Sequence, residues 1–241
     1  RRQAPGGTRA ASGQSLFWDG GAATREDQGL EPWADPKERA FRAEEAAWGV
    51  RADADYRTAF AAVFGDDRVD TRQLAQAIAA FERSLAPSRN RFDRFLGGQS
   101  SALDDAQLRG LHLFRTRAGC MNCHSGPALT DNGFHNLGLH FHGSARQDLG
   151  RYEVTGHPAD SGRFRTPSLR GVANTAPYMH SGLLPRLDGV LAFYNVGGGR
   201  PRAPAVPAAD APPFPQPDPL LRPRGLSRHE LQDLEAFLRL L

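Results

Sequence analysis

The stretch AGCMNCHSG, residues 118–126, holds the only two cysteines of the 241-residue chain, Cys120 and Cys123, and His124 follows them directly. Two cysteines at this spacing can form a redox disulfide, half of a zinc site or the attachment point of a c-type haem. Each of these three kinds of site occurs in a different structural setting. The residues around the motif therefore indicate which site is present, and with it the fold.

The surrounding sequence favours the haem. A thioredoxin-like disulfide would follow a strand in a βαβ unit, but residues 103–114 have apolar side chains at helical spacing, and Asp104 or Ser101 would cap that helix. A structural zinc site needs four ligands, and the chain has no second cysteine pair. In C-x-x-C-H the two thiols add to the porphyrin vinyl groups and the histidine binds the iron. We therefore predict one covalent haem c, held by both cysteines and His124.

Composition and charge exclude other classes of protein. Charged residues make up 24% and hydrophobic residues 39%, as in ordinary globular proteins. No run approaches the roughly 18 apolar residues that span a membrane. The net charge is only +3, and basic residues lie mostly beside acidic ones, so we expect no nucleic-acid partner.

Covalent haem attachment takes place outside the cytoplasm, so we expect the chain or its intact parent to be exported, to the periplasm in a bacterium. The first 14 residues are basic but have no apolar core, so they do not form a signal peptide.

Amphipathic patterns predict a mainly α fold. Residues 41–64 predict two short helices, and Thr71 would cap a longer one that ends before Pro87. Near the other end, Ser227 and Glu230 form a capping box at the start of a closing helix. The apolar stripe of the longer helix consists of Leu74, Ile78, Phe81 and Leu85.

Four further stretches lie in a fixed order around C-x-x-C-H. They are SLFWDGGAATREDQGLEPWADPKE (15–38), FHNLGL (134–139), GRFRTPSLRGVANTAPYMHSG (162–182) and VLAFYN (190–195). Together they resemble the bacterial di-haem cytochrome c peroxidase family, including its MauG-type branch, from about residue 12 to the end of the chain.

The resemblance implies a particular organisation. Members of this family carry two C-x-x-C-H haems, one in each cytochrome c-like domain, and this chain has only the second motif. Residues 1–97 would then be the remnant of the first domain, without its haem motif. Residues 98–241 would be the C-terminal cytochrome c-like domain, a helical fold around one covalent haem.

The resemblance also assigns catalytic positions. Trp18 matches the tryptophan that lies between the two haems and relays electrons, although it could also be an ordinary buried aromatic residue. Gln28, Pro32 and Glu38 match positions that line the peroxide pocket of the first haem. Glu38 would move protons there as a general acid–base; otherwise its segment is a solvated charged loop.

The sixth ligand of the haem iron must come from farther along the chain. Met179, Tyr194 and the histidines are candidates, and Met–His ligation suits electron carriers. The resemblance favours Tyr194, because the MauG-type branch has tyrosine at that position where the peroxidases have methionine. Thr175 and Pro177 match carbonyl ligands of a calcium ion.

The other histidines show no spacing that indicates a metal site, and most are expected at the surface or with satisfied hydrogen bonds. His140 and His142 in particular alternate along a segment expected to be an exposed loop. The full set is His112, His135, His140, His142, His157, His180 and His229.

The resemblance implies a haem c oxidoreductase that couples electron transfer to reduction of hydrogen peroxide or to oxidation of a partner protein. The partners would be a small redox protein, either a c-type cytochrome or a cupredoxin, or a protein substrate. The alternative is a single-haem electron-transfer protein without catalysis of its own.

Overall fold

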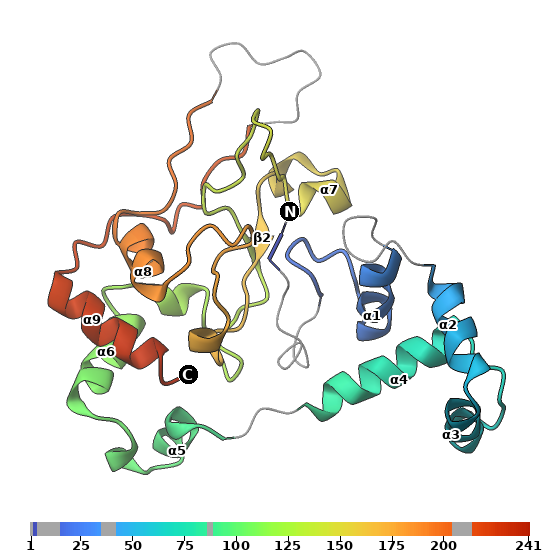
Figure 1. The fold of residues 1–241 in the computed structure, drawn as a ribbon. Helices are drawn as coiled ribbons and strands as arrows, with labels where there is room; N and C mark the ends of the chain where they lie inside the picture. Colours follow the sequence, from blue (N-terminus) through green and yellow to red (C-terminus); the bar gives the residue numbers. More distant parts are fainter. Residues whose placement is uncertain (1, 4–14, 35–41, 86–88, 204–213) are drawn as a thin grey trace. The chain divides into compact units, whose positions relative to one another are not determined.

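The computed structural model describes residues 2–3, 15–34, 42–85, 89–203 and 214–241 (Figure 1). The chain divides into two compact units. The larger unit contains the C-x-x-C-H motif and combines Phe17–Gly21 with Pro87–Leu241. The smaller unit contains Ala22–Ala86. Phe17–Gly21 thus packs with the C-terminal part of the chain, although it lies far from that part in sequence.

The smaller unit is helical. It contains α1 (Arg25–Ala34), α2 (Ala43–Ala52), α3 (Ala54–Phe64) and α4 (Thr71–Ser84). The two short helices predicted within residues 41–64 are confirmed as α2 and α3. Its buried core consists of Ala46, Phe60, Val69 and Leu74.

The start of α4 differs from the prediction. Asp70, not Thr71, is the N-cap, because its carboxylate accepts a hydrogen bond from the Gln73 backbone at 2.8 Å and the Gln73 side chain accepts one from the Asp70 backbone at 3.1 Å. The predicted apolar stripe is buried only at its beginning. Leu74 is 7% exposed, whereas Phe81 is 64% exposed.

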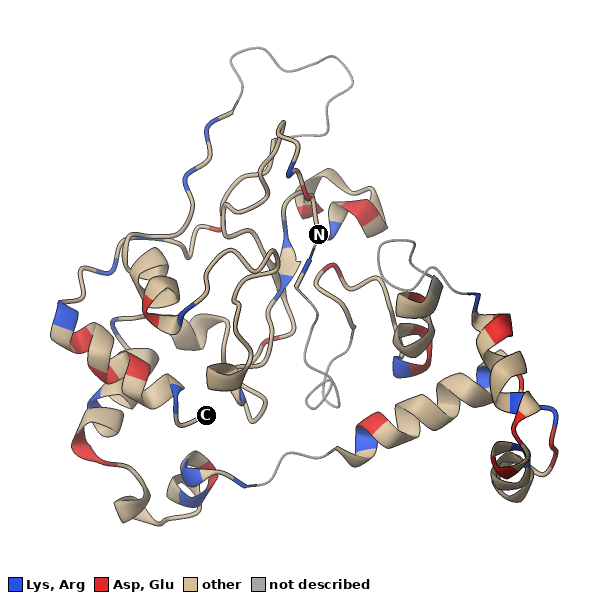
Figure 2. Cartoon of the chain, viewed as in Figure 1, with Lys and Arg blue, Asp and Glu red and all other residues tan. Residues whose placement is uncertain are grey.

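The larger unit surrounds the C-x-x-C-H motif with helices and long loops. Its two short strands, β1 (Phe134–His135) and β2 (Phe164–Arg165), pair antiparallel. Helix α9 begins with a basic residue, Arg228, and its other charged positions are acidic (Figure 2). The helices are α5 (Arg91–Leu96), α6 (Asp105–Arg115), α7 (Tyr152–Thr155), α8 (Leu187–Asn195) and α9 (Arg228–Leu238).

Helices α6 and α9 form the packing centre of this unit. A Cβ atom on Gly110 of α6 would lie only 2.0 Å from the carbonyl oxygen of Asp233 on α9, so the close approach of the two backbones requires glycine. Phe237 of α9 is fully buried and meets Phe114 of α6 and Phe92 of α5 edge to face, at 5.3 and 5.4 Å. Because α6 leads directly into C-x-x-C-H, this contact fixes where the motif lies.

The predicted caps of both helices are confirmed. Asp104 accepts a hydrogen bond from the Gln107 backbone at 2.9 Å, and Ser227 forms a capping box with Glu230. The fold is mainly helical, as the sequence predicts. Within the described residues, no helix is both long and apolar enough to cross a bilayer.

Candidate functional site

The C-x-x-C-H motif forms a tight turn after α6. Cys120–Asn122 is a single 3-10 turn, and the backbone N–H of His124 donates to the carbonyl of Cys120 at 2.9 Å. The carbonyl of Cys123 accepts from the N–H of Asp131 at 2.7 Å, which ties the following loop back onto the motif. Burial raises the pKa of the Cys120 thiol to about 12.

His124 has the tautomer and charge that an iron ligand needs. Its Nδ1 lies 3.1 Å from the carbonyl oxygen of Leu129 and donates to it, so Nε2 carries the lone pair. Burial lowers the pKa of His124 to about 4, which keeps the ring neutral at pH 7. The motif therefore fits a covalent haem whose iron His124 would bind, and a bound haem would supply one-electron redox chemistry.

Tyr194 of α8 lies close to the same cysteines. Burial raises the pKa of its hydroxyl, with smaller contributions from the neighbouring Cys120 and Cys123. A phenolate at this position therefore needs a nearby cation to stabilise it. The end of α8 is held by Asn195, whose amide exchanges hydrogen bonds of 3.0 and 2.9 Å with the backbone of Leu226.

Trp18 lies in a row of three rings. Its indole meets the imidazole of His180 edge to face at 6.5 Å, and that imidazole stacks on Phe164 at 3.6 Å. The indole Nε1 donates to the carbonyl of Gln3 at 2.8 Å, and the carbonyl of Trp18 accepts from the N–H of Arg165 at 2.7 Å. Trp18 therefore has a fixed orientation.

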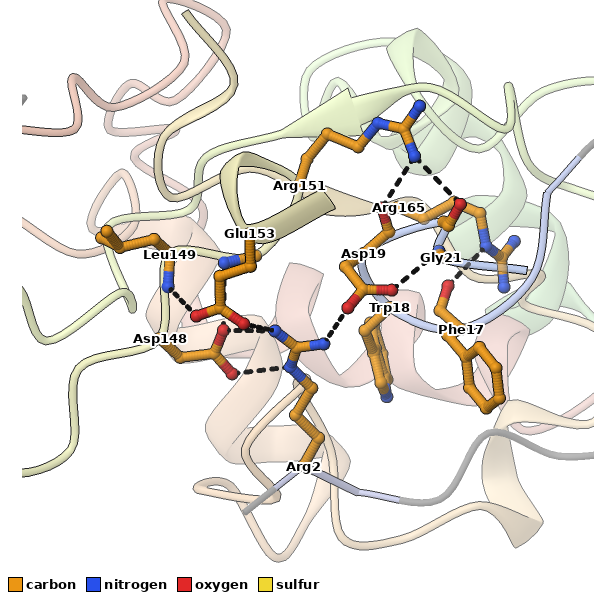
Figure 3. A network of polar contacts seen from close by, with 12 residues as sticks. Arg2, Phe17, Trp18, Asp19, Gly21, Asp148, Leu149, Arg151, Glu153 and Arg165 are labelled. Carbon is orange, nitrogen blue, oxygen red and sulfur yellow. Dashed lines mark hydrogen bonds and ion pairs between the residues drawn. The ribbon is translucent and has the colours of Figure 1, made fainter. Parts of the chain in front are cut away.

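A polar network supports the loop that carries Trp18 (Figure 3). Arg2 binds Asp148 with two hydrogen bonds of 2.8 and 2.7 Å, and it also pairs with Glu153 and with Asp19 next to Trp18. Arg151 donates to the carbonyls of Asp19 and Gly20. No local sequence pattern indicates Arg2, because its partners are up to 151 positions away.

Two of the histidines are more buried than their segments suggest. The expectation of an exposed loop is wrong for His140, which is fully buried with Phe214 packed against it at 5.6 Å. His180 is 4% exposed, and burial lowers the pKa of each of these two rings to about 4. The covering residue Phe214 comes from a distant segment, which sequence patterns do not reveal.

His135, in β1, also has close partners. Its Nε2 lies 2.8 Å from Asp131 and its Nδ1 lies 2.6 Å from Asp218. The ligand atoms of Cys123, Asp131 and His135 all lie within 4.8 Å of one another. This group is therefore adjacent to the predicted haem attachment point.

The predicted peroxide-pocket residues belong to the smaller unit. Gln28 and Pro32 lie on α1, and Glu38 lies outside the described residues. The Oε1 atom of Gln28 is buried without a hydrogen-bond partner among the described residues.

The predicted calcium ligands lie beside Gln3, a residue that no sequence pattern marks as a ligand. The carbonyl of Thr175 accepts from the side-chain amide of Gln3 at 3.3 Å, and the backbone N–H of Gln3 donates to the carbonyl of His180 at 2.6 Å. Pro177 follows two residues after Thr175, on the same exposed segment. Gln3 thus ties the start of the chain to this segment.

Comparison with known proteins assigns the chain to a class of c-type haem proteins. A family model described as di-haem cytochrome c peroxidase matches residues 1–101. The crystal structure of a MauG-like protein associated with microbial copper homeostasis superposes with a TM-score of 0.85 at 33% identity, covering all of this chain and 75% of that one. The chain belongs to the di-haem cytochrome c peroxidase family.

Named relatives fall in both branches of the family. The chain is 33% identical to the cytochrome-c peroxidase IdrP1 of Pseudomonas sp. (strain SCT) over 94% of its length, and 33% identical to the methylamine utilization protein MauG of Methylorubrum extorquens over 100%. It spans 64% of each of these relatives. The diheme peroxidase BthA of Burkholderia thailandensis superposes with a TM-score of 0.74 at 27% identity, over 94% of this chain and 65% of that one. Haem c redox chemistry of the peroxidase and MauG type is thus the function of the family.

Proposed function

We propose that this chain carries the C-terminal haem c of a periplasmic MauG-type oxidoreductase, attached at Cys120 and Cys123 and ligated by His124 and Tyr194. The support comes from the site itself. His124 is partly buried, neutral and oriented through Nδ1, and the partly buried Tyr194 lies close to both cysteines. The anionic oxygen of tyrosinate stabilises oxidised iron, which suits an enzyme that holds oxidising equivalents.

In this proposal Trp18 relays electrons between this haem and the first haem of the intact protein. The rigid hydrogen bonds of its indole and its backbone support this role, because a relay needs a fixed orientation toward both of its neighbours. Residues 1–97 are, in the same proposal, the remnant of the first haem domain.

Gln28, Pro32 and Glu38 would line the peroxide pocket of that first domain. The buried Oε1 of Gln28, which has no hydrogen-bond partner among the described residues, supports this role, because a residue that lines a pocket can offer its acceptor to a bound molecule. Glu38 would hold and transfer a proton as a general acid–base. Hydrogen peroxide would be the oxidant. A small c-type cytochrome or cupredoxin, or an oxidisable protein substrate, would be the partner.

A calcium ion at Thr175 and Pro177 is also part of the proposal. Carbonyl oxygens suit this cation, and a half-turn of the Gln3 amide would place its oxygen beside the carbonyl of Thr175. Gln3→Ala should weaken calcium binding in isothermal titration of the chelator-treated protein. Equal calcium binding by the variant and the parent would contradict this use of Gln3.

The mass of the protein tests the haem assignment most directly. After expression with haem-maturation machinery, the intact mass should exceed that of the polypeptide by one haem, and replacing both cysteines by serine should abolish the increase. The bare polypeptide mass for the parent chain would refute the assignment.

Steady-state kinetics separates the enzyme from a simple electron carrier. With peroxide and a reduced small cytochrome, this chain alone should turn over well below the roughly 1–10³ s⁻¹ typical of enzymes, because both His124 and Tyr194 would bind its haem iron. Turnover in that range would place peroxide reduction on this haem and contradict the proposed ligation.

A further inference from the structure

His135 is held between two carboxylates at the cysteine that is proposed to bind the haem. Asp131 lies 2.8 Å from Nε2 and Asp218 lies 2.6 Å from Nδ1. Since a carboxylate only accepts, both ring nitrogens donate, and the ring is an imidazolium. Hydrogen bonds to Cys123, and then to Asp218 and Asp131, raise the pKa of His135 to about 10. The bonds to the two carboxylates remain when the sulfur becomes a thioether.

The three side chains come from separate parts of the chain. Asp131 and His135 follow the C-x-x-C-H motif, whereas Asp218 is 83 positions beyond His135. Asp218 belongs to residues 214–226, which we call the strap. A backbone hydrogen bond also holds the strap at Asp218, whose N–H donates to the carbonyl of Asn136 at 2.9 Å. At its far end, Leu226 binds Asn195, the residue after Tyr194.

The net charge of Asp131, His135 and Asp218 lies close enough to Cys123 to affect the redox potential of a haem bound there. Two carboxylates and one imidazolium leave one net negative charge next to Cys123. The side chains are only 20% (His135), 27% (Asp131) and 16% (Asp218) exposed, so solvent screens their field less than it would at an open surface. Net negative charge beside a haem favours the oxidised iron, because oxidation adds a positive charge.

We propose that Asp131, His135 and Asp218 form a charge clasp that holds the strap beside Cys123 and keeps the midpoint potential of the haem low. The clasp rests on the proposed function, because it requires a haem on Cys123. Its members act as positioning residues: they set the charge beside the cofactor and take no part in ligating the iron. A low potential suits tyrosinate ligation and the storage of oxidising equivalents.

Redox titration of the holoprotein at pH 8 tests the charge clasp through the sign of the shift. Asp218→Asn removes a negative charge and should raise the midpoint potential. His135→Gln removes the positive charge, leaves two uncompensated carboxylates and should lower it. Asp131→Asn should repeat the effect of Asp218→Asn, which provides a second acidic variant if the first one folds poorly. Asp105→Asn, the same change at the exposed start of α6, is the matched control and should shift the potential least.

If the three residues only held the strap in place, all three clasp variants would shift the midpoint potential in the same direction, because each would loosen the strap and admit water. Shifts of equal sign, or shifts no larger than that of the control, would therefore overturn the clasp. Intact mass measured on the same samples separates the two proposals. A parent chain without haem overturns the proposed function and the clasp together, whereas a loaded chain with the wrong shifts overturns only the clasp.

Discussion

The indole Nε1 of Trp18 donates a hydrogen bond to the backbone carbonyl of Gln3 at 2.8 Å. This bond joins the start of the chain to the tryptophan at the proposed electron relay. Gln3 in turn binds the carbonyls of His180 and Thr175. A short N-terminal segment therefore connects Trp18 to the segment that carries its ring neighbour His180.

Tyr194→Phe tests the sixth iron ligand. The variant removes the donor oxygen and keeps the ring, so we expect a change of spin state and a higher midpoint potential, with the fold retained. Optical and electron paramagnetic resonance spectra measure both. Met179→Leu is the control and should leave them nearly unchanged. If the tyrosine variant has parent-like spectra while Met179→Leu loses its low-spin bands, Met179 is the ligand, and the interpretation as an electron carrier or a peroxidase replaces the MauG-type one.

Arg2→Gln should destabilise the larger unit by about 2 kcal/mol at pH 7, because it leaves partly buried carboxylates without their cation. Burial alone would raise the pKa of Asp148, but the hydrogen bonds and charge of Arg2 lower it below its ordinary value of 3.8. The stabilisation by this pair is therefore complete above pH 3.8 and is lost as the pH falls through the lower folded value.

Urea denaturation of the parent and the Arg2→Gln variant at pH 7 and at pH 3 measures this difference. The gap between the two proteins should narrow at the lower pH. Arg186→Gln removes an exposed pair with Asp188 and should cost much less stability, because solvent screens that pair. An equal loss of stability in both arginine variants would show that the Arg2 network stabilises the protein no more than an exposed ion pair does.

His180→Phe should reduce the sensitivity of the protein to mild acid. Burial lowers the pKa of His180 to about 4 from an ordinary value of 6.5, so protons bind the unfolded chain more tightly. His180 therefore lowers the free energy of unfolding as the pH falls. This loss is absent above pH 6.5 and grows to about 3 kcal/mol by pH 4. Phenylalanine keeps the stack on Phe164 and cannot take up the proton. The stabilities of parent and variant should diverge between pH 6.5 and pH 4, and parallel curves across that interval would disprove the prediction.

Gly110→Ala should separate α6 from α9. Its Cβ would lie 2.0 Å from a backbone oxygen, which cannot move without shifting α9, so we expect a loss of about 3 kcal/mol in thermal or urea unfolding. Gly189→Ala on α8 is the matched control, because nothing lies within 4 Å of its added Cβ. The control should be neutral or stabilising by up to about 1 kcal/mol. A tolerated Gly110→Ala would mean that the two helices do not pack this closely.

The sequence by itself determined the features that depend on neighbouring residues. The C-x-x-C-H motif predicts covalent haem chemistry, because five consecutive residues supply both tethers and one ligand. The helices α2 and α3 and the caps at Asp104 and Ser227 were predicted correctly, because periodicity and capping act within one or two turns. Even locally, Asp70 displaced Thr71 as a cap, because Gln73 was placed to complete a box with the earlier residue.

Only the tertiary structure decided which distant charges and rings meet. The pairing of His135 with Asp218, the binding of Asp148 by Arg2 and the burial of His140 under Phe214 all join segments separated by loops rich in Gly and Pro. Such loops have no periodicity that fixes where they return. Their course is fixed by contacts made across the fold, such as the bonds of Asp218 to His135 and to the backbone of Asn136.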